Sequence, residues 1–291
     1  KNKIYIRIDP AVFEAQKYTI STIGSRSMLS HEQVNIRKAP HMYGWDIMPR
    51  LISAGLWRSV TLEIKKPVRF EQVYWMTNSV DVTGRQAQLI FDWQISTGYM
   101  SADGLTMETS LTKEGNLVYN NRFPLLSFCG RQNISLNNVD FWWPKGYGNP
   151  NLYNYIVRIL DQKNQVLDEK EQRIGIRTAE LIHTDITHED KPGEFVFKIN
   201  GEKIFVRGTN WVPLDALHSR DKTHLDEAIK MTADLNCNMI RCWGGNVYED
   251  NDFFSLCDEN GIMVWQYFAM ACTVYPQNDD FLEKIRKEAI K

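Results

Sequence analysis

The feature that most constrains the fold is an alternation of apolar runs and amphipathic segments in the second half of the chain. Within residues 236–275, a short apolar run ends in Arg241-Cys242-Trp243, an amphipathic segment follows, and a second apolar run ends in Trp265-Gln266-Tyr267. This order is typical of strand, helix and strand. Folds with parallel strands place their ligand chemistry where each strand passes into the following loop. We therefore expect these residues to form part of an active-site rim.

The same alternation continues on both sides of this stretch. We expect strands at 204–211, 239–243 and 262–268, a helix start at Thr223 with Asp226, and a helix stop at Asn260-Gly261. The expected inner faces of the helices are Leu225, Ala228, Ile229, Thr232 and Leu235, then Phe253, Leu256 and Cys257, then Phe281, Leu282, Ile285 and Ala289. Three βα units in succession predict a parallel sheet with its site at the carboxyl ends of the strands.

Residues 68–180 read as a run of short strands separated by turns. One face of an expected strand carries Ala87, Leu89, Phe91, Trp93 and Ile95, a second carries Leu105, Met107, Thr109 and Leu111, and a third carries Tyr153, Tyr155, Val157 and Ile159. Turn residues follow at 113–116 and 161–164. This spacing predicts a β-sandwich that acts as a support domain. Trp142 and Trp143 leave two interpretations open, either carbohydrate binding or a corner that packs on a neighbouring domain.

Residues 1–67 show an interrupted β pattern. Residues 3–8 and 60–64 alternate apolar and polar side chains at period two, as half-buried strands do. Because residues 3–8 already alternate like a strand in the middle of a domain, we expect the protein's true N-terminus to lie upstream. A long polar stretch between the two runs carries Tyr43-Gly44-Trp45-Asp46. Such a loop is often functional, with Asp46 accepting hydrogen bonds from hydroxyl groups. The alternative is that Trp45 fills a core and Asp46 caps a turn.

Composition excludes several classes of function. A formal net charge of -2 provides no basic surface for nucleic acid. The apolar runs are shorter than the roughly 18 residues that span a bilayer, so we expect no membrane insertion. Five cysteines without a CxxC pair indicate buried free thiols. The polar run His183, Asp185, His188, Glu189 and Asp190 lacks a fixed metal-ligand spacing, so we interpret it as a solvated loop and expect no metal and no cofactor.

Several longer motifs resemble a known family. They are Gly208-Thr209-Asn210-Trp211-Val212-Pro213, Asn238-Met239-Ile240-Arg241-Cys242-Trp243-Gly244-Gly245, and the run 254–266 that ends in Val264-Trp265-Gln266, together with Gly44-Trp45-Asp46, Gly55-Leu56-Trp57-Arg58 and Phe141-Trp142-Trp143-Pro144. These motifs look like the β-mannosidase branch of glycoside hydrolase family 2, in the family's order and at its spacing. The resemblance covers nearly the whole chain.

The resemblance implies a multidomain fold of β plus α/β type. Residues 1–67 would be the C-terminal part of a jelly-roll β-sandwich that binds sugar, 68–180 an immunoglobulin-like β-sandwich, and 181–291 the first three βα units of a TIM (β/α)8 barrel. It also implies retaining hydrolysis of terminal β-mannosides. The catalytic acid/base and the nucleophile would both lie on later barrel strands, beyond Lys291. The chain would then be a truncated fragment that is inactive alone.

The resemblance also implies a set of residues that bind the substrate. Trp45 and Asp46 would reach over the barrel mouth, Trp243 would form an aromatic wall of the sugar pocket, and Arg241 would hydrogen-bond the nucleophile. Asn210, Trp211 and Gln266 stand at strand ends in matching motifs. By the same resemblance, the sequence departs from its relatives at Tyr267, where many carry Asp, at Asn246, which replaces a third glycine, and at Ile47-Met48, where Trp-Gly is frequent.

The expected partner is a mannoside or a manno-oligosaccharide, and the habit of the family favours a periplasmic or otherwise exported location. Two alternatives remain open. One is a different family 2 activity, namely a β-galactosidase, β-glucuronidase or exo-β-glucosaminidase. The other is a carbohydrate-binding module without catalysis, made of the two β domains.

Overall fold

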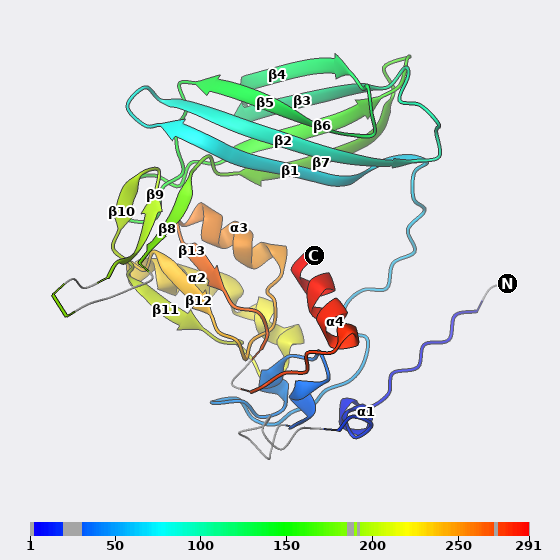
Figure 1. Cartoon of the computed structure of the whole chain (residues 1–291), viewed down its shortest axis with the longest axis vertical. Helices are drawn as coiled ribbons and strands as arrows, with labels where there is room; N and C mark the ends of the chain where they lie inside the picture. Colours follow the sequence, from blue (N-terminus) through cyan, green and yellow to red (C-terminus); the bar gives the residue numbers. More distant parts are fainter. Residues whose placement is uncertain (1–2, 20–30, 185–188, 191–192, 271–272, 291) are drawn as a thin grey trace. The chain divides into compact units, whose positions relative to one another are not determined.

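The computed structural model describes residues 3–19, 31–184, 189–190, 193–270 and 273–290. Two compact units divide the chain (Figure 1). The first unit contains residues 1–61, 208–256 and 264–291, and the second contains residues 62–207 and 257–263. Antiparallel sheets make up the second unit, and a small parallel sheet with helices belongs to the first.

A β-sandwich forms most of the second unit. One sheet has the order β1 (Val68–Asp81), β2 (Gln86–Thr97), β5 (Cys129–Asn137), and the other has the order β4 (Asn116–Pro124), β3 (Thr106–Lys113), β6 (Tyr153–Leu160), β7 (Val166–Ile174). Every neighbouring pair is antiparallel. The predicted alternation is confirmed, because Phe91, Met107 and Val157 are fully buried in one core that both sheets share. The turn predicted at 113–116 is also present, with Glu114 and Gly115 at φ values of 51° and 81°.

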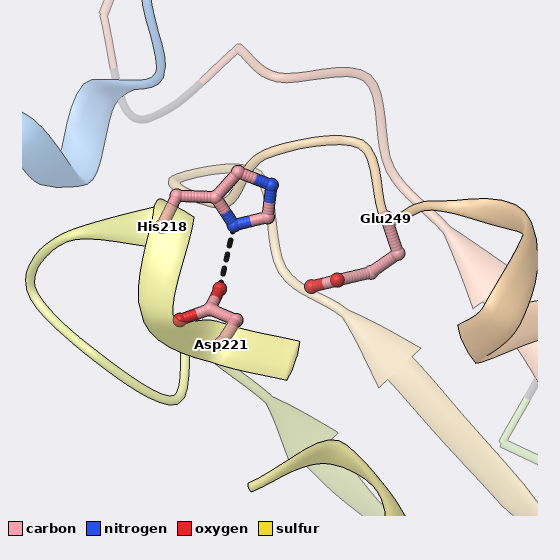
Figure 2. A group of neighbouring side chains, drawn as sticks. All are labelled: His218, Asp221 and Glu249. Atoms are coloured by element: carbon pink, nitrogen blue, oxygen red, sulfur yellow. Dashed lines mark hydrogen bonds and ion pairs between the residues drawn. The ribbon is translucent and has the colours of Figure 1, made fainter. Parts of the chain in front are cut away.

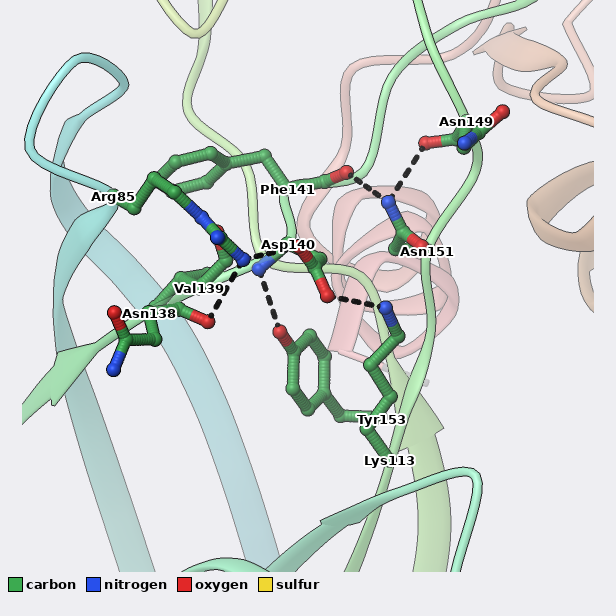
Figure 3. Close-up of polar contacts among 9 residues, drawn as sticks. All are labelled: Arg85, Lys113, Asn138, Val139, Asp140, Phe141, Asn149, Asn151 and Tyr153. Atoms are coloured by element: carbon green, nitrogen blue, oxygen red, sulfur yellow. Dashed lines mark hydrogen bonds and ion pairs between the residues drawn. The ribbon is translucent and has the colours of Figure 1, made fainter. Parts of the chain in front are cut away.

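Asp140 ties together several segments at one end of the sandwich (Figure 3). Its carboxylate accepts hydrogen bonds from Arg85 Nη2 at 2.6 Å and from Lys113 Nζ at 2.5 Å. Its backbone N–H donates to Tyr153 Oη at 2.9 Å. The hydrogen bond from Lys113, followed by the charge of that residue and of Arg85, lowers the pKa of Asp140 against the opposing effect of burial. The Asp140 carboxylate therefore joins the β1–β2 turn to β3, and its backbone N–H adds the start of β6.

Trp142 is a structural residue of the second unit. Its side chain is 1% exposed, and its indole N–H donates to the Asp258 carbonyl at 2.8 Å. The guanidinium carbon of Arg177 lies 4.3 Å from the ring centroid. A ring that is 1% exposed, with its N–H engaged, offers no surface to a sugar, so the interpretation of Trp142 as a carbohydrate-binding residue is wrong.

A second, smaller antiparallel sheet follows the sandwich. Its order is β10 (Glu202–Ile204), β9 (Phe195–Ile199), β8 (Ala179–His183), with Asn200 and Gly201 at positive φ in the β9–β10 turn. The expectation of one continuous strand over 204–211 is wrong. The chain leaves the antiparallel partner β9 after Ile204 and begins a parallel pairing only at Gly208. Apolar alternation continues through both strands and so does not reveal that the partner changes.

The parallel sheet of the first unit has the order β11 (Gly208–Trp211), β12 (Met239–Cys242), β13 (Met263–Gln266). Helices α2 (Leu225–Asp234) and α3 (Asn251–Glu259) follow β11 and β12, and α4 (Asp279–Ile290) follows β13. Ile229 of α2, Ile240 of β12 and Phe253 of α3 are at most 1% exposed, so each of these elements has a buried face. The prediction of three strands that alternate with three helices is confirmed.

Details of the helix ends differ from expectation. Thr223 lies in the 3-10 helix η3 (His218–Thr223), and α2 begins after His224 without a side-chain cap. Leu235 comes after the last residue of α2 and is 71% exposed. The predicted stop of α3 is confirmed, because Gly261 has a φ of 67° directly after the helix.

The expected strands of residues 1–67 are absent from the described part of this region. Its elements are α1 (Ala11–Ala15), η1 (His31–Val34) and η2 (Pro40–Met42). Residues 3–8 and 60–64 are outside any strand, and Leu62 and Ile64 are 92% and 91% exposed. Period-two alternation produces a ladder only beside a partner strand, and none of the described residues pairs with these two segments.

The remaining expectations concern cysteines and one polar run. Cys242 and Cys257 are buried, as predicted, but Cys129 is exposed and Cys237 is half-buried. Cys272, Asp185 and His188 lie outside the described residues. No helix within the described ranges is long and apolar enough to span a membrane.

Candidate functional site

Two residues of the expected site meet at the carboxyl end of the parallel sheet. Asn210 of β11 and Arg241 of β12 are paired in register, so their side chains share one face of the sheet. Asn210 Oδ1 accepts a hydrogen bond from Arg241 Nη1 at 3.0 Å. The guanidinium carbon of Arg241 also lies 4.4 Å from the ring centroid of Tyr267. The amide and the ring together fix the direction in which the guanidinium points.

A loop from the start of the chain meets the residue that follows β12. Asp46 Oδ2 accepts a hydrogen bond from Trp243 Nε1 at 3.1 Å, although 196 residues stand between them in the sequence. Asp46 is exposed and has a φ of 50°. The backbone N–H of His41 donates to the Gly245 carbonyl at 2.9 Å and fixes the base of this loop. The fold therefore brings Asp46 and Trp243 together although they lie far apart in the sequence.

Gly245 allows Trp45 to pack beside Trp243. A Cβ atom on Gly245 would collide with the Trp45 indole and would lie 2.9 Å from Trp243 Cζ2. Trp45 itself is half-buried. The interpretation of Trp45 as the plug of a sandwich core is therefore wrong, since it packs on the loop after β12. Two indoles and one carboxylate thus gather around Gly245, and side chains of these types can contact the C–H face and the hydroxyl groups of a sugar.

The other two expected residues serve as supports. Trp211 is 5% exposed, donates from Nε1 to Glu249 Oε1 at 2.9 Å, and packs against Phe253 with ring centroids 5.0 Å apart. Gln266 donates from Nε2 to the Tyr267 carbonyl at 2.7 Å. Both side chains hold the local structure behind the strand ends. The structure thus brings together Trp45, Asp46 and Trp243 in one group and Asn210 and Arg241 in another, and contact of any of them with sugar stays a prediction.

Sequence reasoning missed a polar cluster in the same unit. His218, Asp221 and Glu249 come together there, with one nitrogen or oxygen atom from each within 4.8 Å of the others. Burial, opposed by the hydrogen bond from Trp211, raises the pKa of the Glu249 carboxyl. His218 and Asp221 lie in a region without helical or strand periodicity, and Glu249 lies in the loop before α3, so no spacing signal joins them.

Two cavities lie beside this cluster. The first has a volume of about 360 Å³ and is lined by residues that include Trp57, His218, Asp221 and Glu249. The second has a volume of about 830 Å³ and extends along Lys38, Tyr248 and Asn246. Neither cavity is lined by the residues that the sequence selected for sugar binding.

Comparison with known proteins agrees with the motifs. Residues 68–177 match the family described as Glycosyl hydrolases family 2. The chain is 35% identical over 260 residues to β-mannosidase B of Aspergillus terreus, which covers 89% of this chain and 30% of that protein. It is 33% identical over 262 residues to the β-mannosidase of Bos taurus, covering 87% of this chain and 29% of that one.

A solved structure gives the same result in three dimensions. The β-D-mannosidase from Dictyoglomus thermophilum superposes with a TM-score of 0.80 at 34% sequence identity, over 96% of this chain and 34% of that chain. This chain thus spans about 30% of the length of the curated relatives it matches. The chain belongs to glycoside hydrolase family 2, and β-mannosidases are among its homologues.

Proposed function

We propose that this chain is the substrate-binding part of a retaining β-mannosidase, which hydrolyses terminal, non-reducing β-mannosides. The proposal rests first on homology to β-mannosidases over the region that the chain spans. The single structural observation that carries it is the hydrogen bond of 3.1 Å between Trp243 and Asp46. That bond attaches the loop that carries the Asp46 carboxylate to the residue after a parallel strand, where a sugar pocket is expected.

The proposed roles follow from the chemistry of each group. Trp45 and Trp243 offer apolar faces to the C–H groups of a pyranose, and Asp46 accepts from its hydroxyl groups. Arg241 keeps a nearby carboxylate ionised and oriented, because a guanidinium forms charge-assisted hydrogen bonds with it. Asn210 and Tyr267 would hold Arg241 in that orientation.

Retaining hydrolysis needs two carboxyl groups about 5 to 5.5 Å apart, one as nucleophile and one as acid/base. By resemblance, both belong to barrel strands beyond those of this chain. We also assign, by the same resemblance, residues 1–67 to the C-terminal part of a jelly-roll domain, 68–180 to an immunoglobulin-like domain and 181–291 to the N-terminal part of a (β/α)8 barrel. The two compact units of the structure instead group residues 1–61 with 208–256 and 264–291, and 62–207 with 257–263. Truncations at the domain boundaries would decide between the two divisions.

The proposal is tested with 4-nitrophenyl β-mannoside. We expect the 291-residue chain to release no 4-nitrophenol above buffer, whereas the full-length parent protein turns the substrate over. A panel of β-galactoside, β-glucuronide and β-glucosaminide substrates checks the sugar. Preference for any of these over the mannoside would contradict the proposal, and so would activity in the 291-residue chain alone.

Substitutions in the full-length protein test the binding roles. Loss of a charge-assisted hydrogen bond in Asp46→Asn or Arg241→Lys should lower kcat/KM by about tenfold or more, equivalent to roughly 1.5–3 kcal/mol. Asp226→Asn, at an exposed position of α2, is the matched control and should leave kcat/KM unchanged. Wild-type kinetics in both Asp46→Asn and Arg241→Lys would remove these residues from the site.

A further inference from the structure

A cluster of histidine and carboxylate side chains connects the loops that follow two neighbouring parallel strands. His218 and Asp221 belong to η3 in the loop after β11, and Glu249 belongs to the loop after β12. Figure 2 shows the three side chains turned toward one another. One potential ligand atom of each lies within 4.8 Å of the other two. The cluster is thus assembled by the fold from residues that are far apart in the sequence.

Each member is held in place by the surrounding protein. Asp221 Oδ2 lies 2.6 Å from His218 Nδ1, and its Oδ1 accepts the backbone N–H of Asp215 at 2.8 Å. Glu249 Oε1 accepts from the Trp211 indole at 2.9 Å. Among the described residues, no hydrogen bond engages His218 Nε2 or the second oxygen of Glu249. An imidazole whose Nδ1–H is held by a carboxylate keeps the lone pair of Nε2 for a metal ion, which is the usual arrangement around a metal-binding histidine.

The surroundings favour a bound cation. The side chains of His218 and Asp221 are only 10% and 7% exposed, and the cluster lines the cavity of about 360 Å³ whose wall includes Trp57. Two basic residues, Arg58 and Lys222, also face this cavity. Each is paired, Arg58 with Asp250 and Lys222 with Asp252, so their charges are offset locally. The two carboxylates of the cluster therefore dominate the field inside the cavity.

A separate observation points to a missing bonding partner nearby. His41 is 0% exposed, and neither of its ring nitrogens has a hydrogen-bond partner among the described residues. Burial and then the charge on His218 lower the pKa of His41 to about 4, so its imidazole is neutral near pH 7. A buried imidazole without hydrogen bonds is costly. The ring nitrogens of His41 lie outside the group of three ligand atoms, so a water molecule bound to an ion there would supply the partner.

We propose that His218 and Glu249, with Asp221 holding the imidazole, bind a divalent transition-metal ion of the Zn²⁺ type. One imidazole nitrogen with carboxylate oxygens suits Zn²⁺, whereas Mg²⁺ and Ca²⁺ prefer sites made of oxygen alone. Ligand atoms lie about 2.0–2.2 Å from Zn²⁺, so side-chain rotations that move the ligand atoms by about 1 Å would bring them into coordination. The ion ties the loop after β11 to the loop after β12 and thereby stabilises both. This inference does not depend on the proposed function.

The test is a titration of the 291-residue chain after dialysis against a chelator. We expect saturable binding of one Zn²⁺ by calorimetry, an increase of the melting temperature with Zn²⁺ concentration, and visible absorption bands on addition of Co²⁺. Mg²⁺ at the same concentration should produce neither heat of binding nor a shift in melting temperature.

Variants locate the ion. His218→Ala and Glu249→Gln should each weaken Zn²⁺ binding by about tenfold or more, and the glutamine keeps an oxygen for the Trp211 indole. His224→Ala, at the exposed histidine between η3 and α2, is the matched control and should bind as the wild type does. Circular dichroism establishes that each variant is folded. Absence of saturable binding in the wild-type chain, or equal affinity in His218→Ala, Glu249→Gln and His224→Ala, overturns the proposal.

Discussion

The guanidinium carbon of Arg241 lies 4.4 Å from the ring centroid of Tyr267, and the Tyr267 ring is itself stacked on Trp265 with centroids 5.8 Å apart. Arg241 is thus oriented by an aromatic face, together with the amide of Asn210. An aromatic support holds the guanidinium without competing for its charge.

Removal of the Tyr267 ring should loosen Arg241. A cation–π contact contributes about 0.5–2 kcal/mol, so Tyr267→Leu should lower kcat/KM of the full-length protein on the aryl β-mannoside by about 2- to 30-fold. Tyr267→Phe keeps the ring and should stay near the wild-type value. If the two substitutions have equal effects, the ring does not position Arg241.

Gly245 should be intolerant of a side chain. A Cβ there meets the Trp45 indole and lies 2.9 Å from Trp243 Cζ2, so Gly245→Ala should cost about 1–3 kcal/mol of unfolding free energy or displace Trp45. Chemical denaturation and tryptophan fluorescence would detect these two effects. Gly98→Ala is the matched control, because a Cβ at that position has no heavy atom within 4 Å. Unchanged stability and fluorescence in Gly245→Ala would show that Trp45 does not pack on this glycine.

The regular parts of the fold could be predicted because each carries its own period. Phe91, Met107 and Val157 stand on alternating faces that become fully buried, and Ile229 and Phe253 stand on helical faces that do the same. Such patterns depend only on which side of an element is buried, which the sequence records directly.

The remainder could not be predicted because it depends on partners. Residues 60–64 alternate like a strand, but the described residues supply no strand beside them. The resemblance to a family implies that Asp46 and Trp243 line one pocket, but nothing in the sequence predicts the hydrogen bond between them. The cluster of His218 and Asp221 with Glu249 joins two loops, and loop conformation leaves no periodic trace.

Asp140 should make the stability of the sandwich depend on pH. Its pKa is lowered in the folded chain, chiefly by the hydrogen bond from Lys113, so the folded state binds the proton less readily than the unfolded state does. Its contribution is fully present above the unfolded pKa of about 4 and is lost as pH falls below that value. The difference in unfolding free energy between wild type and Asp140→Asn should therefore shrink from pH 6 to pH 3. Asp103→Asn, in the exposed loop before β3, serves as the surface control. A difference that stays constant over this range would contradict the assignment.

The core of the sandwich should depend strongly on Phe91. This side chain is 0% exposed, and its ring centroid lies 4.8 Å from that of Trp75 and 5.4 Å from that of Trp93. Phe91→Ala leaves a cavity among these rings, so we expect a loss of about 3–5 kcal/mol in the free energy of unfolding. Urea denaturation followed by tryptophan fluorescence measures it. Leu117→Ala, at a side chain that is 63% exposed, should change the free energy by no more than about 0.5 kcal/mol. A loss below about 1 kcal/mol in Phe91→Ala would mean that the two sheets can close the cavity, contrary to the close packing expected of such a core.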